Sequence, residues 1–355
     1  MGLVLPAGVL ADHGSAALRR RLLHECDVDA LVGLDNRRGI FPIHRSVRFV
    51  LLTASSGAPT RAMACRLGEH DPSVLESAGD GSEPTAAWFP VSITPALLER
   101  ISGDDLTIPA FRSRIDVSIA ERAAAMFAPL GSAGGWQARF GRELNATDDR
   151  DEFRPPGTGL PIVEGKHVES FRCDVGGARH AIPSRAAHRL VPSAGFERPR
   201  LGYRDVAGAT NRRTLIAAIV PGGCVSTHTV FCLRTMLGLR AQHFLCGLFN
   251  SFVLDYLVRL RVSTHVTTAI VERLPVPRRE DAPEAFAGVA ALARVLARRS
   301  HPKALARLQA RVAALYRLSA AEFQHLLDTF PLVPAAERAA ALEEFVTTRT
   351  QGVHR

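Results

Sequence analysis

Three short and almost continuous apolar runs near the amino terminus constrain the fold more than any other feature of the chain. They cover residues 2–9, 28–34 and 47–53. Apolar runs without polar alternation are typical of strands that are buried on both faces, as in an α/β sheet. We expect a helix between the first two runs, with an apolar stripe of Ala17, Leu18, Leu22 and Leu23. Three strands cannot complete such a domain, so other parts of the chain or a partner must supply the rest.

The remaining sequence has a different character from one segment to the next. With 355 residues, the chain has room for about two domains. We expect it to divide into part of a sheet domain, a bridging region that ends in a glycine-rich break at residues 131–135, a domain of mixed strands and loops, and a helical tail. These segments are 1–64, 65–135, 136–278 and 279–355. The apolar spacing predicts strands at 160–163, 215–220 and 225–233, and helices at 94–101, 116–127, 241–261, 284–299, 302–316, 319–328 and 334–346.

The charge of the chain favours a polyanionic partner. The formal net charge is +9, and only two of the 44 basic residues are lysines. Residues 195–275 contain ten arginines and four acidic residues, together with Thr, Asn and His side chains that can reach base edges. Guanidinium groups make two-point contacts with phosphate and with guanine. DNA binding by this region is therefore one interpretation, and a solvated basic face in an arginine-rich chain is the other.

Phe41 lies in a basic loop and has two interpretations. It precedes the third apolar run, and the arginines around it are Arg37, Arg38, Arg45 and Arg48. An aromatic residue at the start of a strand is usually part of the core. An exposed ring in a basic loop instead offers a surface on which a nucleic-acid base can stack, with a gain of ~1–3 kcal/mol per base.

Glu164 and Lys166 match half of a metal-dependent nuclease pattern. The pattern needs a further acid upstream to hold Mg²⁺ while the lysine orients a water molecule. The acids available for this are Asp148, Asp149 and Asp151. A turn after the strand at 160–163 explains the same two residues equally well.

A second set of residues has the side chains of a metal site but not the spacing. Its members are Cys224, His228, Cys232, His243 and Cys246. If residues 224–232 form a strand, each four-residue step spans ~13 Å. Zinc ligands must all lie about 2–2.3 Å from one ion, so we expect no metal site here. Six cysteines without a close framework are typical of free thiols in the cytoplasm, where we expect the protein to be.

Two long segments near the amino terminus resemble a known family. LVLPAGVLADHGSAALRRRLL (3–23) and VDALVGLDNRRGIFPIHRSVRFVLLTA (28–54) resemble the end of the catalytic domain of adenine-specific (N6) DNA methyltransferases of the large restriction–modification type. In that family, the first segment is a late strand of a Rossmann-like sheet that follows the catalytic Asn-Pro-Pro-aromatic motif. Later segments resemble a TaqI-like specificity domain, a mixed α+β target-recognition domain, at 135–153, 160–171, 198–221 and 227–277. The resemblance extends into residues 316–334.

The resemblance implies that the chain recognises DNA and positions a target adenine. Members of the family extrude the adenine and stack it on an aromatic residue, in a position like that of Phe41 in the GIFP segment. Together with the charge pattern, the resemblance implies a DNA-facing surface. Its residues are Arg37, Arg38, Arg45, Arg204, Asn211, Arg212, Arg213, Thr227, His228, Thr229, Thr264 and His265.

The sequence also departs from the family. The loop that holds S-adenosylmethionine and the Asn-Pro-Pro-aromatic tetrad have no counterpart in it. We therefore expect a C-terminal portion of such an enzyme that binds no cofactor alone, is inactive alone, and has double-stranded DNA and an N-terminal methyltransferase half or subunit as partners. Two alternatives stay open. One is a Mg²⁺-dependent endonuclease that uses Glu164 and Lys166, and the other is an interaction protein whose helical tail over 284–346 docks a partner.

Overall fold

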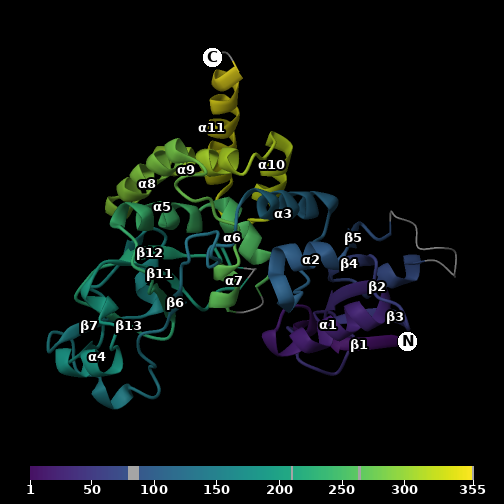
Figure 1. The fold of residues 1–355 in the computed structure, drawn as a ribbon, viewed down its shortest axis with the longest axis horizontal. Coiled ribbons are helices and arrows are strands. Elements are labelled where there is room, and N and C mark those ends of the chain that lie inside the picture. Colours follow the sequence, from purple (N-terminus) through teal and green to yellow (C-terminus); the bar gives the residue numbers. More distant parts are fainter. Residues whose placement is uncertain (79–87, 209–210, 263–264, 354–355) are drawn as a thin grey trace. The chain divides into compact units, whose positions relative to one another are not determined.

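The computed structural model describes residues 1–78, 88–208, 211–262 and 265–353, and the chain forms two compact units (Figure 1). Unit 1 comprises residues 1–124, and unit 2 comprises residues 125–355. Both contain strands and helices, so the architecture is mixed α/β. The division falls within helix α3 (Arg114–Met126), before the glycine-rich segment at 131–135. Most of the expected bridging region therefore belongs to unit 1.

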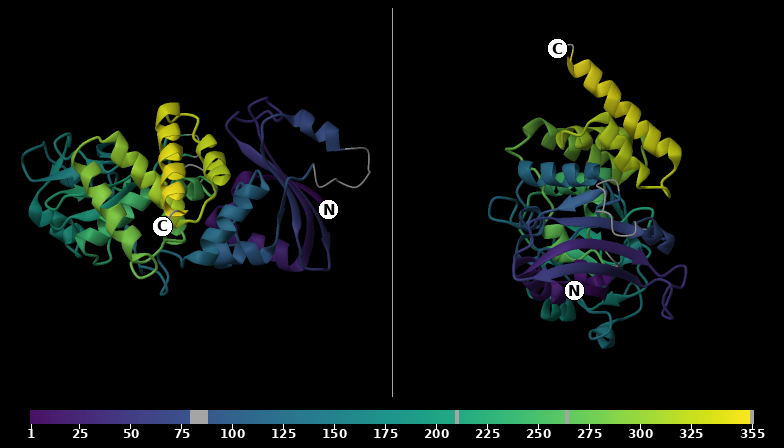
Figure 2. Two further views of the ribbon diagram at one scale, coloured as in Figure 1. Left: turned by 90° about the horizontal axis from the view of Figure 1, so that it is seen from above. Right: turned by 90° about the vertical axis from the view of Figure 1, so that its right-hand side faces the viewer.

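One sheet forms the centre of unit 1. Its strands are β1 (Gly2–Pro6), β2 (Cys26–Asp35), β3 (Arg48–Ser56), β4 (Met63–Glu69) and β5 (Val91–Ile93). They lie in the order β1-β3-β2-β4-β5 (Figure 2). Because β3 is antiparallel to both β1 and β2, these two strands point the same way, and β4 is also parallel to β2. The carboxyl ends of β1, β2 and β4 thus lie on the same side of the sheet.

The two faces of this sheet are covered by different parts of the chain. Side chains alternate along a strand, so Leu31 of β2 points to one face, and Val32 and Leu34 point to the other. The first face is packed against helix α1 (Ala16–Glu25). The second face is covered by partly buried aromatic side chains, among them Phe41, which pack on Val32 and Leu34. Phe41 is therefore part of the cover of the sheet.

Two expectations for unit 1 are wrong. The run at 2–9 is not buried on both faces, because β1 is an edge strand whose Val4 is 56% exposed. The stripe of α1 includes Leu22 and Leu23 as expected, but Ala17 and Leu18 are exposed. Arg19 is buried in their place, because its guanidinium group donates hydrogen bonds to three backbone carbonyl groups. Helix α2 (Pro95–Ser102) and α3 confirm the two helices expected in the bridging region.

Unit 2 contains three small sheets within its described residues. An antiparallel sheet has the order β12-β11-β14-β6, with β6 (Phe140–Gly141), β11 (Arg200–Arg204), β12 (Ala217–Val220) and β14 (Val230–Leu233). A second sheet has the order β10-β7-β13, with β7 (Leu160–Val163), β10 (Ala181–Ile182) and β13 (Val225–Ser226). The third is the pair β8 (Val168–Glu169) and β9 (Arg172–Cys173). The strand expected at 225–233 is thus two strands of different sheets, separated by a turn at Thr227–Thr229.

Helices complete unit 2. They are α4 (Ser184–Leu190), α5 (Leu239–Phe249), α6 (Phe252–Arg259), α7 (Thr268–Glu272), α8 (Pro283–Arg298), α9 (Pro302–Leu315), α10 (Ala320–Asp328) and α11 (Ala335–Val353). The four helices expected after residue 283 are confirmed. Helix α8 packs on α5, so these helices belong to unit 2. The helix expected at 241–261 is broken, since the Ser251 hydroxyl accepts a hydrogen bond from the Leu254 amide and begins α6.

No helix within the described ranges has the length and apolar character needed to cross a membrane.

A buried ion pair joins the two larger sheets of unit 2. Arg200 on β11 donates through Nε and Nη2 to the two carboxylate oxygens of Glu143, each at 2.6 Å, and these side chains are 4% and 6% exposed. Glu143 also accepts from the amide and the hydroxyl of Ser226 on β13. Glu143 therefore satisfies groups on strands of both sheets. A carboxylate removed from such a site leaves a guanidinium group buried without its charge partner.

We expect Glu143→Ala to lower the free energy of unfolding of unit 2 by about 3–5 kcal/mol, because Arg200 then stays buried and unpaired. Urea unfolding followed by circular dichroism measures this loss. Glu152→Ala is the control, because Glu152 pairs with Arg189 at the surface and such pairs contribute less than about 1 kcal/mol. Equal losses in the two variants would contradict the prediction.

Candidate nucleic-acid interface

Polar side chains gather in unit 1 where the parallel strands β2 and β4 end. Asp35 is the last residue of β2, and His70 follows β4. The Nδ1 atom of His70 lies 2.7 Å from Oδ2 of Asp35, so the structure brings the two strand ends together. Ligands of α/β sheets commonly bind outside the carboxyl ends of the parallel strands. This edge is therefore the part of unit 1 best placed for binding.

The loop over residues 36–47 is held by one buried side chain. Asn36 is 0% exposed, and its Oδ1 accepts a hydrogen bond from the Phe41 amide at 2.9 Å. Its Nδ2 donates to the carbonyl groups of Phe41 at 3.0 Å and Ile43 at 2.9 Å. A single amide side chain thus replaces the hydrogen bonds that a strand partner would supply. The loop is therefore preorganised around Phe41.

The side chain of Phe41 packs against the core and is partly exposed. It lies edge-to-face against Phe49 with ring centroids 4.9 Å apart. Its neighbours Ile40 and Ile43 are 36% and 49% exposed. Phe41 therefore contacts the core, as the first interpretation expected, and base stacking stays a prediction.

Three exposed arginines belong to this loop. Arg37 pairs with Asp35 at 3.1 Å, and Arg38 pairs with Asp71 at 2.9 Å. Arg45 donates from Nη1 to the carbonyl group of Arg37 at 2.8 Å. Hydrogen bonds from Ser73, with a smaller contribution from Arg38, lower the pKa of Asp71, so this carboxylate is charged at neutral pH. The loop therefore presents guanidinium groups to solvent on both sides of Phe41 in the sequence.

The predicted residues of unit 2 fall into two groups. The first surrounds the buried carboxylate of Asp205. His265 Nδ1 lies 3.3 Å from Oδ1 of Asp205, and Arg142 Nη2 lies 3.3 Å from Oδ2. Both side chains are 53% exposed. Thr264 lies outside the described residues.

The turn Thr227–Thr229 lies beside this group, since the Asp205 amide donates to the carbonyl group of Thr229. Thr227 is 1% exposed, and its hydroxyl is hydrogen-bonded to that of Thr229, which also accepts from the Gly165 amide at 2.8 Å. The two threonines thus hold the turn. His228 is partly exposed and accepts from the Ala146 amide at Nδ1, so the neutral ring carries its proton on Nε2 and can donate it.

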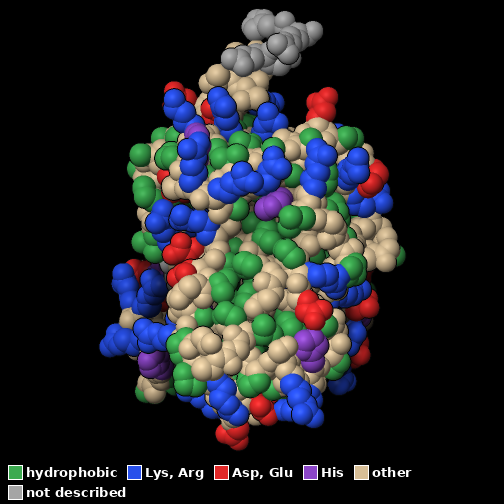
Figure 3. Space-filling view, turned by 90° about the vertical axis from the view of Figure 1, so that its left-hand side faces the viewer, with side chains coloured by type: hydrophobic (Ala, Val, Ile, Leu, Met, Phe, Trp, Pro, Cys, Tyr) green, Lys and Arg blue, Asp and Glu red, His purple; other side chains and the backbone are tan. Residues whose placement is uncertain are grey.

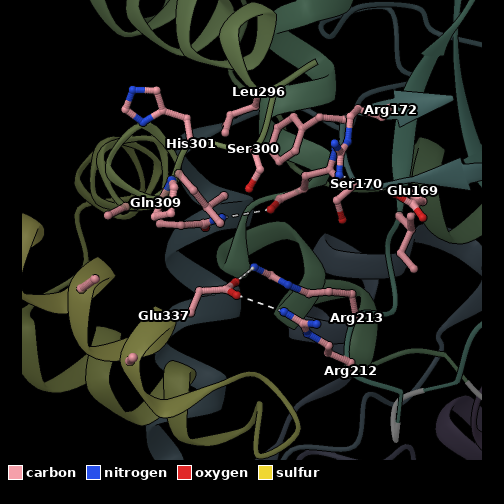
Figure 4. A pocket seen from close by; sticks show the side chains of 18 of the residues that line it. Glu169, Ser170, Arg172, Arg212, Arg213, Leu296, Ser300, His301, Gln309 and Glu337 are labelled. Atoms are coloured by element: carbon pink, nitrogen blue, oxygen red, sulfur yellow. Dashed lines mark hydrogen bonds and ion pairs between the residues drawn. The ribbon is translucent and has the colours of Figure 1, made fainter. Parts of the chain in front are cut away.

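The second group lines a pocket of about 740 Å³ (Figure 4). Its predicted members are Arg204, Asn211, Arg212 and Arg213. Asn211 and Arg212 are exposed. Arg213 is enclosed, with its guanidinium group 3.8 Å from the ring centre of Phe252. Burial lowers the pKa of Arg213, opposed by Asp255 and Glu337.

Figure 3 shows one face of unit 2 with Lys and Arg side chains at its upper end and along its rim, around a centre of hydrophobic and uncharged side chains. Arg142 and Arg172, which lie outside the segment 195–275, are also exposed.

The residues considered for metal binding are placed as follows. Lys166 Nζ lies 2.5 Å from Oε2 of Glu164, and this contact contributes to lowering the pKa of Glu164 against the effect of burial. Burial raises the pKa of Cys232 and Cys246 to about 12, so both thiols are protonated. Within the described ranges, no three His, Cys, Asp or Glu side chains are grouped so that they could hold a metal ion. The nuclease alternative gains no support from this geometry.

Sequence reasoning missed four residues of these groups. Asn36, His70, Arg142 and Glu337 are not among the predicted site residues. The signal for Asn36 was its position directly after a buried strand, and that for Arg142 was its place in the segment 135–153. Nothing local in the sequence connects Glu337 to Arg212, because the two are 125 positions apart.

No protein-family model matches the chain, and no curated protein matches it. Solved structures that it resembles include the type IIG restriction endonuclease BpuSI, at 10% identity and a TM-score of 0.43 over 97% of this chain and 46% of that one. Another is the type IIL restriction-modification enzyme MmeI in complex with DNA, at 11% identity and a TM-score of 0.49 over 93% and 49%. A third is a structure of a type I restriction-modification system, at 15% identity and a TM-score of 0.27 over 65% of this chain and 51% of that one. The chain spans about half the length of each, and likenesses this distant establish neither its fold nor its function.

We expect Asn36→Ala to loosen the loop around Phe41, because the Phe41 amide loses its acceptor. The cost in the free energy of unfolding is about 1–3 kcal/mol. Hydrogen exchange read by mass spectrometry should show faster exchange of the amides in 36–47. Ser46→Ala serves as the control in the same loop, since its hydroxyl bonds only at the exposed surface with His44 among the contacts described. Unchanged exchange in Asn36→Ala would refute the role given to Asn36.

Proposed function

We propose that this chain recognises double-stranded DNA and positions a target adenine for N6 methylation in a restriction–modification system. Phe41 is the stacking surface for the extruded base in this proposal. S-adenosylmethionine is held by a methyltransferase half or subunit other than these residues. The proposal takes its chemistry from the family resemblance and its geometry from the loop at 36–47.

The observation that carries the proposal is the preorganised ring of Phe41 among exposed arginines. A base that leaves the duplex loses its stacking and pairing, which costs a few kcal/mol. An aromatic ring fixed in advance recovers about 1–3 kcal/mol of that cost. Asn36 fixes the backbone of Phe41, and Phe49 contacts its ring, before DNA arrives. The guanidinium groups of Arg37, Arg38 and Arg45 are exposed, and their ion pairs and hydrogen bond at the surface are weak enough to be exchanged for adjacent phosphates in this proposal.

Unit 2 supplies the recognition surface in this proposal. His228, His265 and Arg142 are partly exposed donors around Asp205, and they can reach phosphates or base edges. Their hydrogen bonds to Asp205 and Ala146 orient the rings and the guanidinium group before binding. Asn211 and Arg212 add exposed polar groups at the pocket in this proposal, whereas Thr227 and Thr229 act by holding the turn that carries His228.

We expect Phe41 to favour DNA in which an adenine is already unstacked. The probe is a duplex with a single bulged 2-aminopurine, compared with the fully paired duplex, and fluorescence reports both binding and stacking. Wild type should prefer the bulged duplex by about fivefold to 150-fold, which corresponds to 1–3 kcal/mol. Phe41→Ala should lose this preference, and Phe41→Tyr should keep it.

The control for this experiment is Phe89→Ala. Phe89 packs on the same cluster of Val32, Leu34 and Phe49, so its loss weakens the sheet cover in a similar way without removing the loop ring. If Phe89→Ala lost the preference to the same extent as Phe41→Ala, the stacking role would be wrong.

We expect DNA affinity to fall steeply with salt, since each neutralised phosphate releases counterions. The slope of log Kd against log[NaCl] should decrease by about 0.9 for each arginine of the loop that contacts phosphate and is replaced by Gln. Fluorescence anisotropy with a duplex at 50–200 mM NaCl measures this slope.

Methyl transfer from S-adenosylmethionine should need an added methyltransferase half. Robust transfer by this chain alone, or a flat response to salt, would overturn the proposal.

A further inference from the structure

The pocket of unit 2 has a charge arrangement that the proposed function does not explain. Four arginines and two glutamates line it, so its formal charge is +2. The arginines are Arg172, Arg204, Arg212 and Arg213, and the glutamates are Glu169 and Glu337. Figure 4 shows Glu337 pointing from α11 toward Arg212 and Arg213, with Ser170 and Arg172 across the opening. A basic pocket of this size admits a phosphate group with its sugar.

The backbone that carries Arg212 is fixed independently of Glu337. Arg259 on α6 donates to the carbonyl groups of Asn211 and Arg212, the latter at 3.0 Å. Asp255, which is 0% exposed, accepts from the Thr214 amide at 3.1 Å. The side chain of Arg212 can therefore change partners while its backbone stays in place.

Glu337 makes the contact that a phosphate would make. Its two oxygens each accept from one guanidinium group, Oε2 from Arg212 at 3.1 Å and Oε1 from Arg213 at 3.4 Å. Guanidinium groups donate charge-assisted hydrogen bonds to carboxylates and to phosphates alike. If Glu337 leaves, Arg213 still has its ion pair with Asp255, at 3.8 Å, and its contact with the ring of Phe252. Arg212 is 60% exposed, and ion pairs at such positions are weak in water.

We propose that Glu337 occupies the place of a DNA backbone phosphate in the free protein, and that DNA binding displaces it from Arg212. The inference rests on the proposed function and deepens it, because it names the phosphate contact of this surface and the group that limits its affinity. Glu169 pairs with Arg172 at 3.6 Å, so Arg212 is the guanidinium group that the departure of Glu337 frees for the phosphate. Glu337 then acts as an internal competitor of DNA.

The test compares Glu337→Gln with Glu343→Gln in the full chain. Glu343 is exposed on the same helix, so the two variants have the same net charge and differ only in where it changes. Anisotropy with a duplex should show DNA binding about threefold or more tighter for Glu337→Gln at 100 mM NaCl, with a salt slope steeper by about 0.9. Glu343→Gln should stay within about twofold of wild type, as nonspecific charge effects are screened. Adding Arg212→Ala to Glu337→Gln should remove the gain.

The outcomes separate the two proposals. If wild type binds DNA and Glu337→Gln binds it no tighter than Glu343→Gln, the internal competitor is wrong while the proposed function stands. If neither wild type nor Glu337→Gln binds DNA, both fail. Titration with inorganic phosphate distinguishes the source of the ligand, because a gain for phosphate without one for DNA would assign the pocket to a small phosphorylated molecule and overturn the DNA assignment. Thermal unfolding of each variant confirms that the compared proteins are folded.

Discussion

The amide side chain of Asn36 is the constraint on which the candidate site of unit 1 depends. It is fully buried, and it joins the amide and carbonyl groups of Phe41 to the carbonyl group of Ile43. Buried backbone groups need partners, and a loop that leaves the end of a strand has no neighbouring strand to provide them. Asn36 supplies them from within the loop. The arginines and the aromatic ring can therefore lie at the surface on a backbone that needs no ligand to order it.

Unit 2 uses the same solution with charged groups. Asp255 and Asp205 are buried carboxylates that accept from the backbone or from arginine and histidine side chains near the sheet. Burial raises the pKa of Asp255, while Arg213, Arg259 and nearby amides oppose this rise. Each carboxylate fixes a segment that regular secondary structure does not hold. The exposed donors of the candidate interface are next to these fixed segments, so buried acids position the basic surface.

Periodicity predicted those parts of the fold in which burial follows the local repeat. Helices α8, α9 and α10 agree with the prediction because one side of each is apolar, and strand β7 agrees because it is a short continuous apolar run. The broken strand at 225–233 could not be foreseen, since the turn at Thr227 depends on Gly165 and Thr229 meeting across the fold. Charge indicated Arg37 and Arg212 as surface residues. It also indicated Arg213 as a surface residue, and this was wrong. Charge alone could not show the enclosure of Arg213, because only the tertiary structure brings Phe252 against its guanidinium group.

The enclosure of Arg213 has a consequence for the order in which unit 2 assembles. Its contacts come from Asp255 and Phe252 on α6, Phe330 after α10 and Glu337 on α11, so the chain must close loops of about 40 to 120 residues before this corner is complete. Contacts between positions so far apart form slowly, because the entropy of loop closure must be overcome first. During synthesis, the segment 211–213 leaves the ribosome long before α11 does. We expect the guanidinium group of Arg213 to stay accessible in nascent chains and to become fully enclosed only when α11 docks.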